Sequence, residues 1–232
     1  MGNVMPSASQ PSSLNDIGQE TAKILLDIEA VNFRPQNPYT LTTGRVSPVY
    51  IDCRKLISYP EERRRVMEMA VAILEATVGF DTIDAVAGGE TAGIPYAAWI
   101  AEARALPMLY VRKKAKGFGR NAQIEGDMKN DSRVLLVEDL ATDGGSKINF
   151  VNALRTAGAR VNDVFVVFFY DIFKGTAETL NEAGVRLHHL ATWRDVVEEA
   201  EKSTRFSADA IAGVRRFLAD PVAWSAAHGG KE

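Results

Sequence analysis

The segment VLLVEDLATDGGS, residues 134–146, decides the fold prediction because it joins an apolar run, an acidic pair and a glycine-rich turn. Val134 to Val137 predict a buried strand that delivers Glu138 and Asp139 at its carboxyl end. A loop from Leu140 to Gly145 is expected next, and Ser146 is expected to open a helix. Ligands of open α/β sheets bind beyond the carboxyl ends of the strands, so this loop is a candidate ligand site.

The residue types of this loop suit a ligand that carries both a phosphate and a sugar. Gly144 and Gly145 allow close backbone approach, and Thr142, Ser146 and the first N–H groups of the helix can cradle a phosphate. The two carboxylates then need another partner, and vicinal ribose hydroxyls are donors that they can accept. The alternative is a strand end followed by an ordinary turn. The complete series of features favours a phosphoribosyl site. The order GGSK does not match a Walker A loop.

Apolar runs alternate with helical patterns on both sides of this segment. Further strands are predicted at 83–86, 108–111, 161–170 and 185–190, and helices at 92–105, from 146 to about 158, and at 173–183. This alternation predicts an α/β fold with a mostly parallel central sheet flanked by helices. The first 80 residues break the pattern, with helices from Leu14 and Pro60 around short β pieces at 39–41 and 49–51. They predict an N-terminal cap on the sheet.

The expected organisation is therefore a tail at 1–13, an N-terminal helix and cap segment at 14–80, a core at 81–200 and a C-terminal helix and tail at 201–232. Two polar-faced helices are expected to close the chain. The first thirteen residues and the final HGGKE are small and polar, which predicts disorder at both ends.

Composition excludes several classes of protein. The 232 residues are 46% hydrophobic, enough for a full core without covalent staples. The single Cys53 excludes an intramolecular disulfide framework and a multi-cysteine zinc site. A formal net charge of -3 argues against general nucleic-acid binding. No secretory signal or membrane span is evident, which predicts a cytoplasmic protein. His188 and His189 are expected to be packed in a strand rather than to bind a metal.

A basic segment follows the predicted strand at 108–111. Arg112, Lys113, Lys114, Lys116 and Arg120 place five positive charges, and no negative ones, within nine residues. A flexible cationic lid suits a reaction whose leaving group is pyrophosphate, because negative charge grows on the departing oxygen. The alternative is a solvated charged face. GFGRNA also matches a dinucleotide fingerprint, but weakly, since the five residues 112–116 separate it from the strand.

Three segments together resemble a known family. VLLVEDLATDGGS looks like the phosphoribosyl-diphosphate (PRPP) motif of type I phosphoribosyltransferases. VRKKAKGFGRNAQIEG resembles the catalytic lid of orotate phosphoribosyltransferases, and TLTTGRVSPVYIDCRKLI resembles their orotate-side segment. The resemblance covers about residues 31–199. It implies the type I phosphoribosyltransferase fold and the transfer of phosphoribose from PRPP to orotate, which gives orotidine 5'-monophosphate and diphosphate in de novo pyrimidine synthesis.

The resemblance also implies roles for individual residues. Arg112, Lys113 and Lys116 would hold the diphosphate, with Lys116 and Asp139 as the catalytic candidates. PRPP would further contact Glu138, Asp139, Leu140, Ala141, Thr142, Asp143, Gly144, Gly145 and Ser146. Tyr50, Ile51 and Thr142 would contact orotate. Mg²⁺ would arrive on the substrate rather than in a protein cage. The family also implies a homodimer in which the lid of one subunit closes over the partner's site.

Some positions depart from the family pattern. Thr42 and Ala92 stand where lysine is common, and Phe118 replaces a lid histidine. The usual arginine for the orotate carboxylate is missing after the strand at 161–170, which leaves Arg34, Arg45, Arg54 and Arg194 as open alternatives. Two other functions are weighed: a phosphoribosyltransferase for another base such as a purine, and a non-catalytic PRPP-sensing regulator.

Overall fold

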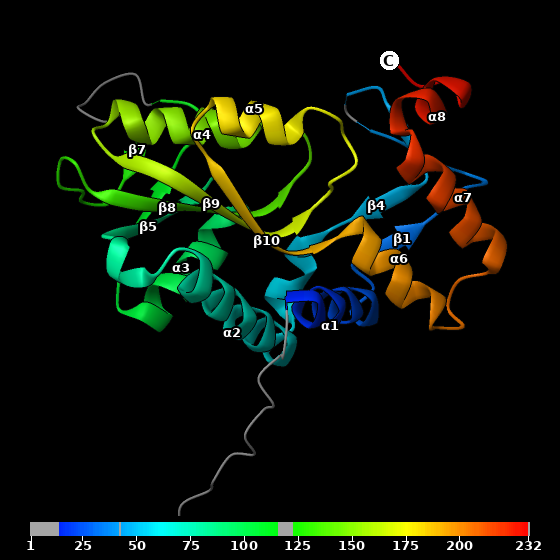
Figure 1. The fold of residues 1–232 in the computed structure, drawn as a ribbon, viewed down its shortest axis with the longest axis horizontal. Helices are drawn as coiled ribbons and strands as arrows, with labels where there is room; N and C mark the ends of the chain where they lie inside the picture. The colour runs from blue at the N-terminus through cyan, green and yellow to red at the C-terminus, as the bar shows by residue number, and fades with distance from the viewer. Residues whose placement is uncertain (1–13, 42, 116–122, 232) are drawn as a thin grey trace, which may run out of the picture.

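A six-stranded sheet forms the centre of the computed structural model, which describes residues 14–41, 43–115 and 123–231 (Figure 1). Along the sheet the order is β10 (Arg186–Thr192), β9 (Arg160–Phe169), β8 (Arg133–Ala141), β5 (Ala85–Gly89), β6 (Met108–Val111) and β7 (Ile124–Glu125). All neighbours are parallel except β6 and β7. The α/β class with a mostly parallel sheet is therefore confirmed, and β7 is an antiparallel edge strand that the sequence did not indicate.

Helices cover both faces of this sheet. In Figure 1, α1 (Leu14–Asp27), α2 (Pro60–Thr77) and α3 (Gly93–Arg104) lie below it, and α4 (Gly145–Thr156) and α5 (Thr176–Glu182) lie above it. Successive side chains of β8 alternate between these layers. Leu135 and Val137 belong to the core cluster on the α2 and α3 side, whereas Val134 and Leu136 belong to the cluster on the α4 side.

The boundaries of β8 and α4 differ from the sequence prediction. The strand continues past Val137 to Ala141, because Leu140 and Ala141 pair in register with Phe168 and Phe169 of β9. Glu138 and Asp139 therefore lie within the strand, and the loop that follows is shorter than predicted. The helix begins at Gly145, one residue before Ser146.

The segment before α2 forms small β elements at one end of the main sheet. β1 (Val31–Phe33) pairs with β4 (Val49–Ile51), and β2 (Tyr39–Thr40) pairs with β3 (Val46–Ser47), both antiparallel. Short 3-10 helices, η1 (Cys53–Ser58) and η2 (Phe80–Thr82), flank α2.

Three helices, rather than the two expected, close the chain: α6 (Trp193–Glu201), α7 (Ala208–Ala219) and α8 (Pro221–Ala227). The break between α7 and α8 falls at Asp220, whose carboxylate accepts a hydrogen bond from the Ala223 N–H.

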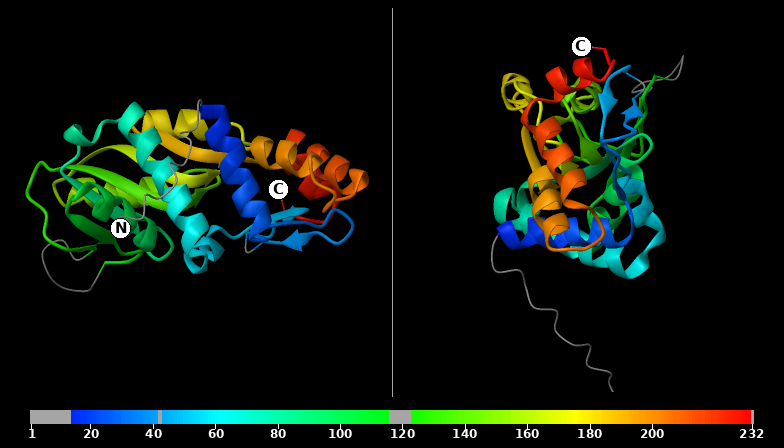
Figure 2. Two further views of the ribbon diagram at one scale, coloured as in Figure 1. Left: turned by 90° about the horizontal axis from the view of Figure 1, so that it is seen from below. Right: turned by 90° about the vertical axis from the view of Figure 1, so that its right-hand side faces the viewer.

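The prediction of a disordered HGGKE tail is wrong for the part of it that the structure describes. Gly230 N–H donates to Ser225 O, and Lys231 N–H donates to Gly44 O at 2.9 Å. Figure 2 shows this end of the chain beside the strands of the N-terminal segment. The tail is held because the Gly44 carbonyl of the β2–β3 turn and the Ser225 carbonyl of α8 accept its hydrogen bonds. The tail predicted at 1–13 lies outside the described residues.

Among the described helices none is long and apolar enough to cross a membrane. The cytoplasmic location stays a prediction.

Candidate functional site

Glu138 and Asp139 are neighbours in sequence but point to opposite faces of the sheet, because they lie within a strand. Glu138 faces α4, where the Lys147 Nζ lies 3.7 Å from its Oε2. Asp139 faces the other layer, where Arg54, at the start of η1, lies close enough to influence its pKa. Both carboxylates nevertheless line one pocket, of about 540 Å³, beyond the carboxyl ends of β5, β6 and β8.

The position of this pocket follows from the strand order. The connection from β5 runs to β6 on one side, and the next parallel strand, β8, lies on the other side of β5. Such a reversal of direction opens a crevice between the two loops at the carboxyl edge, where α/β proteins bind their ligands. Glu90 and Ala92, from the loop after β5, form one wall of the pocket, and residues of α4 form the opposite wall.

Burial changes the acidity of both carboxyl groups. Desolvation raises the pKa of Glu138 to about 7, although the nearby Lys147 ammonium acts in the opposite direction. Desolvation also raises the pKa of Asp139, against the effects of Lys147, of the Leu140 N–H and of Arg54. The Leu140 N–H donates to Asp139 Oδ1 at 2.9 Å. The pocket thus contains carboxylates that hold protons more tightly than free ones do.

The turn between β8 and α4 has the shape of an anion cradle. Gly144 has a φ of 80°, and a Cβ at this position would also press on Leu180 of α5 at 3.2 Å. Asp143 Oδ1 accepts a hydrogen bond from the Gly145 N–H at 3.2 Å. Ser146 then stands in the first turn of α4, where backbone N–H groups lack helical acceptors and favour a phosphate.

Two of the predicted lid cations are placed differently from each other. Lys113 lines the pocket, and its backbone N–H donates to Glu90 Oε2 at 2.7 Å. Arg112 instead turns to β7, where its Nη1 lies 3.5 Å from Glu125 Oε1. Lys116, Phe118 and Thr42 lie outside the described residues, so the catalytic role predicted for Lys116 stays a prediction.

The residues predicted to contact orotate lie on β4 and in the phosphate turn. Tyr50 is half-buried, and its ring centroid lies 5.4 Å from that of Tyr39. Ile51 is buried in the main core and pairs with Val31, so its side chain faces away from Tyr50. Thr142 is half-buried at the end of β8.

The four arginines considered for the orotate carboxylate lie in different parts of the molecule. Arg34 lies over the ring of Tyr39, and Arg194 lines other pockets, near β10. Arg54 lines the pocket of the two carboxylates and bonds Asp52 through its Nε at 2.6 Å. Arg45 lines a separate pocket, described next.

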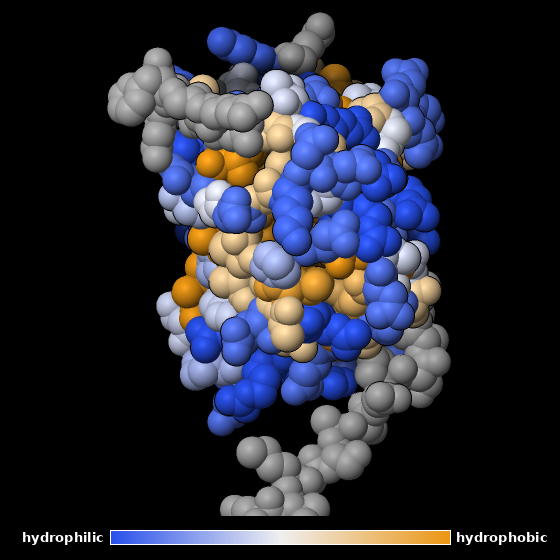
Figure 3. Space-filling model, turned by 90° about the vertical axis from the view of Figure 1, so that its left-hand side faces the viewer, coloured by the Kyte–Doolittle hydropathy of each residue, from blue (hydrophilic) through white to orange (hydrophobic). Residues whose placement is uncertain are grey.

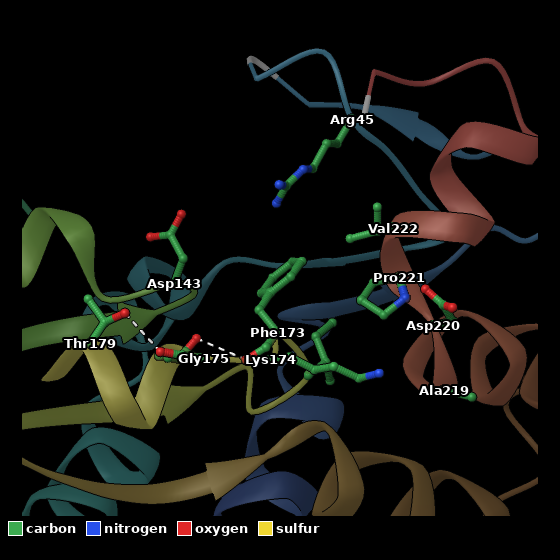
Figure 4. Close-up of a pocket in the computed structure, with 12 residues that line it drawn as sticks. Arg45, Asp143, Phe173, Lys174, Gly175, Thr179, Ala219, Asp220, Pro221 and Val222 are labelled. Carbon is green, nitrogen blue, oxygen red and sulfur yellow. Dashed lines mark hydrogen bonds between the residues drawn. The ribbon is translucent and has the colours of Figure 1, made fainter. Parts of the chain in front are cut away.

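A second pocket, of about 480 Å³, lies between the phosphate turn, the loop before α5 and α8. Figure 4 shows Arg45 pointing toward Phe173, with Asp143 on the opposite wall. The Arg45 guanidinium carbon lies 5.3 Å from the centre of the Phe173 ring. Asp143 of the turn after β8 and Arg45 thus line the same pocket.

Sequence reasoning missed Glu90 and Lys147 as lining residues. Lys147 shares one helical face with Phe150, Val151 and Leu154, all buried. Lys147 occupies an otherwise apolar position of an amphipathic pattern, and this exception to the pattern would have identified it as a candidate.

The histidine pair of β10 contributes to packing. His188 Nε2 lies 2.7 Å from Asp163 Oδ1, and its Nδ1 lies 3.0 Å from Thr77 Oγ1. In the part of the chain that the structure describes, no group of three or more His, Cys, Asp or Glu side chains could hold a metal ion.

Comparisons with known proteins agree on one family, although no family model matches the chain. Orotate phosphoribosyltransferase of Ruegeria sp. (strain TM1040) is 52% identical over 224 residues, which are 97% of this chain and 99% of that protein. The crystal structure of orotate phosphoribosyltransferase from Aeropyrum pernix has a TM-score of 0.68 and 32% identity, covering 78% of this chain and 98% of that one. Leishmania donovani UMP synthase has a TM-score of 0.74 and 30% identity, covering 86% of this chain and 42% of that one.

These relatives are enzymes that transfer a phosphoribosyl group, and the agreement extends over nearly the whole sequence. The alternatives of a purine-specific transferase and of a non-catalytic regulator are not favoured. The type I phosphoribosyltransferase fold, the acidic strand end and these relatives together show that the chain belongs to the orotate phosphoribosyltransferases.

Proposed function

We propose that orotate and PRPP react in the pocket that Glu138 and Asp139 line, giving orotidine 5'-monophosphate and diphosphate. The observation that supports this assignment is the placement of two buried carboxylates, Ser146 in the first turn of α4 and Lys113 around one pocket at the carboxyl edge of the sheet. A ring nitrogen of orotate forms the new bond to ribose C1 as the bond from C1 to the diphosphate oxygen breaks.

The ribose 5-phosphate half of PRPP is assigned to the strand end and the turn. Glu138 and Asp139 accept hydrogen bonds from the ribose hydroxyls, and residues 141–146 bind the 5'-phosphate through the first turn of α4. Because the carboxylates enter the pocket from opposite faces of the sheet, they hold the ribose from two sides. This clamp fixes C1 relative to the incoming base.

The diphosphate is assigned to the loops after β5 and β6. Lys113 supplies positive charge there. The hydrogen bond from its backbone N–H to Glu90 holds the start of the segment after β6 against the loop after β5. Arg112 and Lys116 keep the diphosphate roles that the family resemblance implies. Together these cations stabilise negative charge on the departing oxygen.

Mg²⁺ fits this pocket as an ion held by PRPP. The pocket offers carboxylates and open space rather than a cage of several protein ligands, which suits an ion that takes most of its ligands from phosphate and water. When bound, Mg²⁺ would neutralise charge on the diphosphate. Lys113 then orients the diphosphate, and the carboxylates orient the ribose.

The base is assigned to Tyr50 and Thr142, as the family resemblance implies, although neither residue lines the pocket of the two carboxylates in the described structure. Tyr50 offers an aromatic face for the pyrimidine, and Thr142 stands between the base and the phosphate turn. In this division of the chain, residues 14–80 form the cap that supplies the base side, and residues 81–200 form the core that binds PRPP.

A homodimer is part of the same proposal. Figure 3 shows apolar side chains gathered at the end of the molecule where β7 lies in Figure 1. β6 and β7 form this edge of the sheet, and they carry the half-buried apolar residues Met108 and Ile124. We assign this surface to contact with a second copy, whose lid would close over the pocket. Light scattering after size exclusion would measure the mass, and a monomeric mass at working concentration would contradict the assignment.

The test of the activity is a base panel. The purified chain, with PRPP and Mg²⁺, is given orotate, uracil, hypoxanthine or adenine, and diphosphate release is measured. Turnover is expected with orotate alone. Turnover with a purine and none with orotate would overturn the assignment.

Asp139→Asn should reduce orotate turnover strongly while the protein stays folded. The amide of asparagine lacks the negative charge that is proposed to accept hydrogen bonds from the ribose hydroxyls.

A further inference from the structure

Lys147 is a buried lysine at the start of α4, and only 7% of its surface is exposed. Its neighbours on the same helical face, Phe150, Val151 and Leu154, are apolar core residues. Burying an ammonium group is costly unless a carboxylate compensates it, so a lysine in this position needs a specific partner.

That partner is Glu138. The Lys147 Nζ lies 3.7 Å from Glu138 Oε2 and 3.1 Å from Ser146 Oγ. The other carboxylate oxygen, Glu138 Oε1, is buried and has no hydrogen-bond partner in the described structure. It rests so closely on β5 that a Cβ at Gly89 would lie 1.8 Å from it. Glu138 is therefore fixed in place with one oxygen near Lys147 and the other unpaired.

The remaining charged groups near Glu138 do not replace Lys147. Asp139, on the same strand, is negative and raises the pKa of Glu138 further. Glu90, Lys113 and Arg54 line the same pocket, but in the described structure none of them forms a hydrogen bond or an ion pair with the Glu138 carboxylate, and Gly89 and Phe150 bring no charge. Lys147 is thus the cation that packs against this carboxylate from α4.

A protonated Glu138 could not do what the proposed function asks of it. The ionised group accepts hydrogen bonds at both oxygens, whereas the protonated group has converted one of them into a donor. With its pKa raised to about 7, the carboxyl group titrates near neutral pH, so a small change in its surroundings decides its charge.

We propose that Lys147 is a positioning residue of the phosphoribosyl site, whose buried ammonium group keeps Glu138 ionised and oriented to accept the ribose hydroxyls. This inference rests on the proposed role of Glu138 in binding PRPP. Lys147 acts through Glu138, and the reaction needs no proton transfer to or from it.

The experiment measures kcat/KM for PRPP from pH 5.5 to 9 in Lys147→Met and Lys147→Arg. Removing an opposite charge at this distance should raise the pKa of Glu138 by about one unit or more. In Lys147→Met the acid limb of the profile should therefore move to higher pH, with a loss of roughly tenfold near pH 6.5 that shrinks toward pH 9. Lys147→Arg keeps the charge and should keep the acid limb in place. PRPP ionises identically in all assays, so it does not contribute to the difference.

A uniform loss across the pH range, or a rise in KM for PRPP with an unmoved acid limb, would overturn the proposal and assign Lys147 to direct substrate contact or to packing. Lys147→Gln replaces Lys147→Met if the latter does not fold. As a second readout, adding Lys147→Met to Glu138→Gln should produce no further change in the pH profile. Absence of orotate turnover by the unaltered chain would instead contradict the proposed function, and is measured separately.

Discussion

The phosphate side and the base side of the site are held in place in different ways. The side proposed to bind phosphate is β8, its turn and α4, all within residues 133–156, and its side chains rest on neighbouring backbone of the sheet. The base side includes the β2–β3 turn, which the far end of the chain fixes: Val46 N–H donates to Ser225 Oγ at 2.9 Å, although the two residues are 179 apart. One half of the proposed site is therefore built from residues close together in the sequence, whereas the other half depends on contacts between distant residues.

This contrast predicts which substitutions affect both substrates and which affect orotate alone. Damage to the sheet beneath β8 should reduce stability and all activity. Loosening of the C-terminal contacts should weaken orotate binding and leave PRPP binding nearly intact.

The largest effect is expected for Gly93→Ala, at the start of α3. A Cβ there would lie 2.3 Å from Val137 O, and this backbone atom of a central strand cannot move aside. We expect a loss of roughly 3 kcal/mol or more in the free energy of unfolding, together with loss of turnover, because α3 can no longer pack on β8. Denaturant unfolding and the diphosphate assay measure both.

Gly79→Ala is the matched control. A Cβ at Gly79 meets nothing within 4 Å, so its cost comes only from the φ of 77° and should be about 1 kcal/mol. Equal stability of the two variants would show that the contact of α3 with β8 adapts readily.

The next effect tests the base side as a whole. Ending the chain after Asp220 removes α8, the bond from Val46 to Ser225 and the bond from Lys231 to Gly44. Each lost bond is worth about 0.5–1.5 kcal/mol, so KM for orotate should rise roughly tenfold while KM for PRPP changes less than about threefold. Steady-state kinetics with each substrate varied in turn measure this. An equal rise in both KM values would contradict the separation of the two sides, and circular dichroism checks that the shortened chain is folded.

The smallest effect compares two adjacent glycines of the tail. A Cβ at Gly230 would lie 2.2 Å from Ser225 Oγ and 2.7 Å from Val46 N, directly in the contact between the tail and β3. Gly230→Ala should therefore raise KM for orotate several-fold, by displacing a hydrogen bond worth about 1 kcal/mol. A Cβ at Gly229 meets nothing, so Gly229→Ala should cost only the strain of its φ of 81°. If Gly229→Ala affected orotate binding as much as Gly230→Ala, close packing of the tail would not be the cause.

Much of the core could be predicted from the sequence because its signals are local. The apolar run before Glu138, the glycines at 144 and 145, and the alternation of strands with helices all depend on residues close together in the chain. The predicted strand ends too early, at Val137. Leu140 and Ala141 become strand residues only by pairing with Phe168 and Phe169 of β9.

The fold class and the glycine-rich turn after β8 could be predicted from the sequence alone, because hydrophobic periodicity and turn chemistry act over a few residues. Three features became visible only in the tertiary structure. Glu138 and Asp139 point to opposite faces of the sheet, and Lys147 is buried beside Glu138. The C-terminal tail contacts the β2–β3 turn. These features arise from pairing and packing between distant segments. No local pattern encodes which distant backbone group will receive a hydrogen bond, so the base side of the site depends on the completed fold.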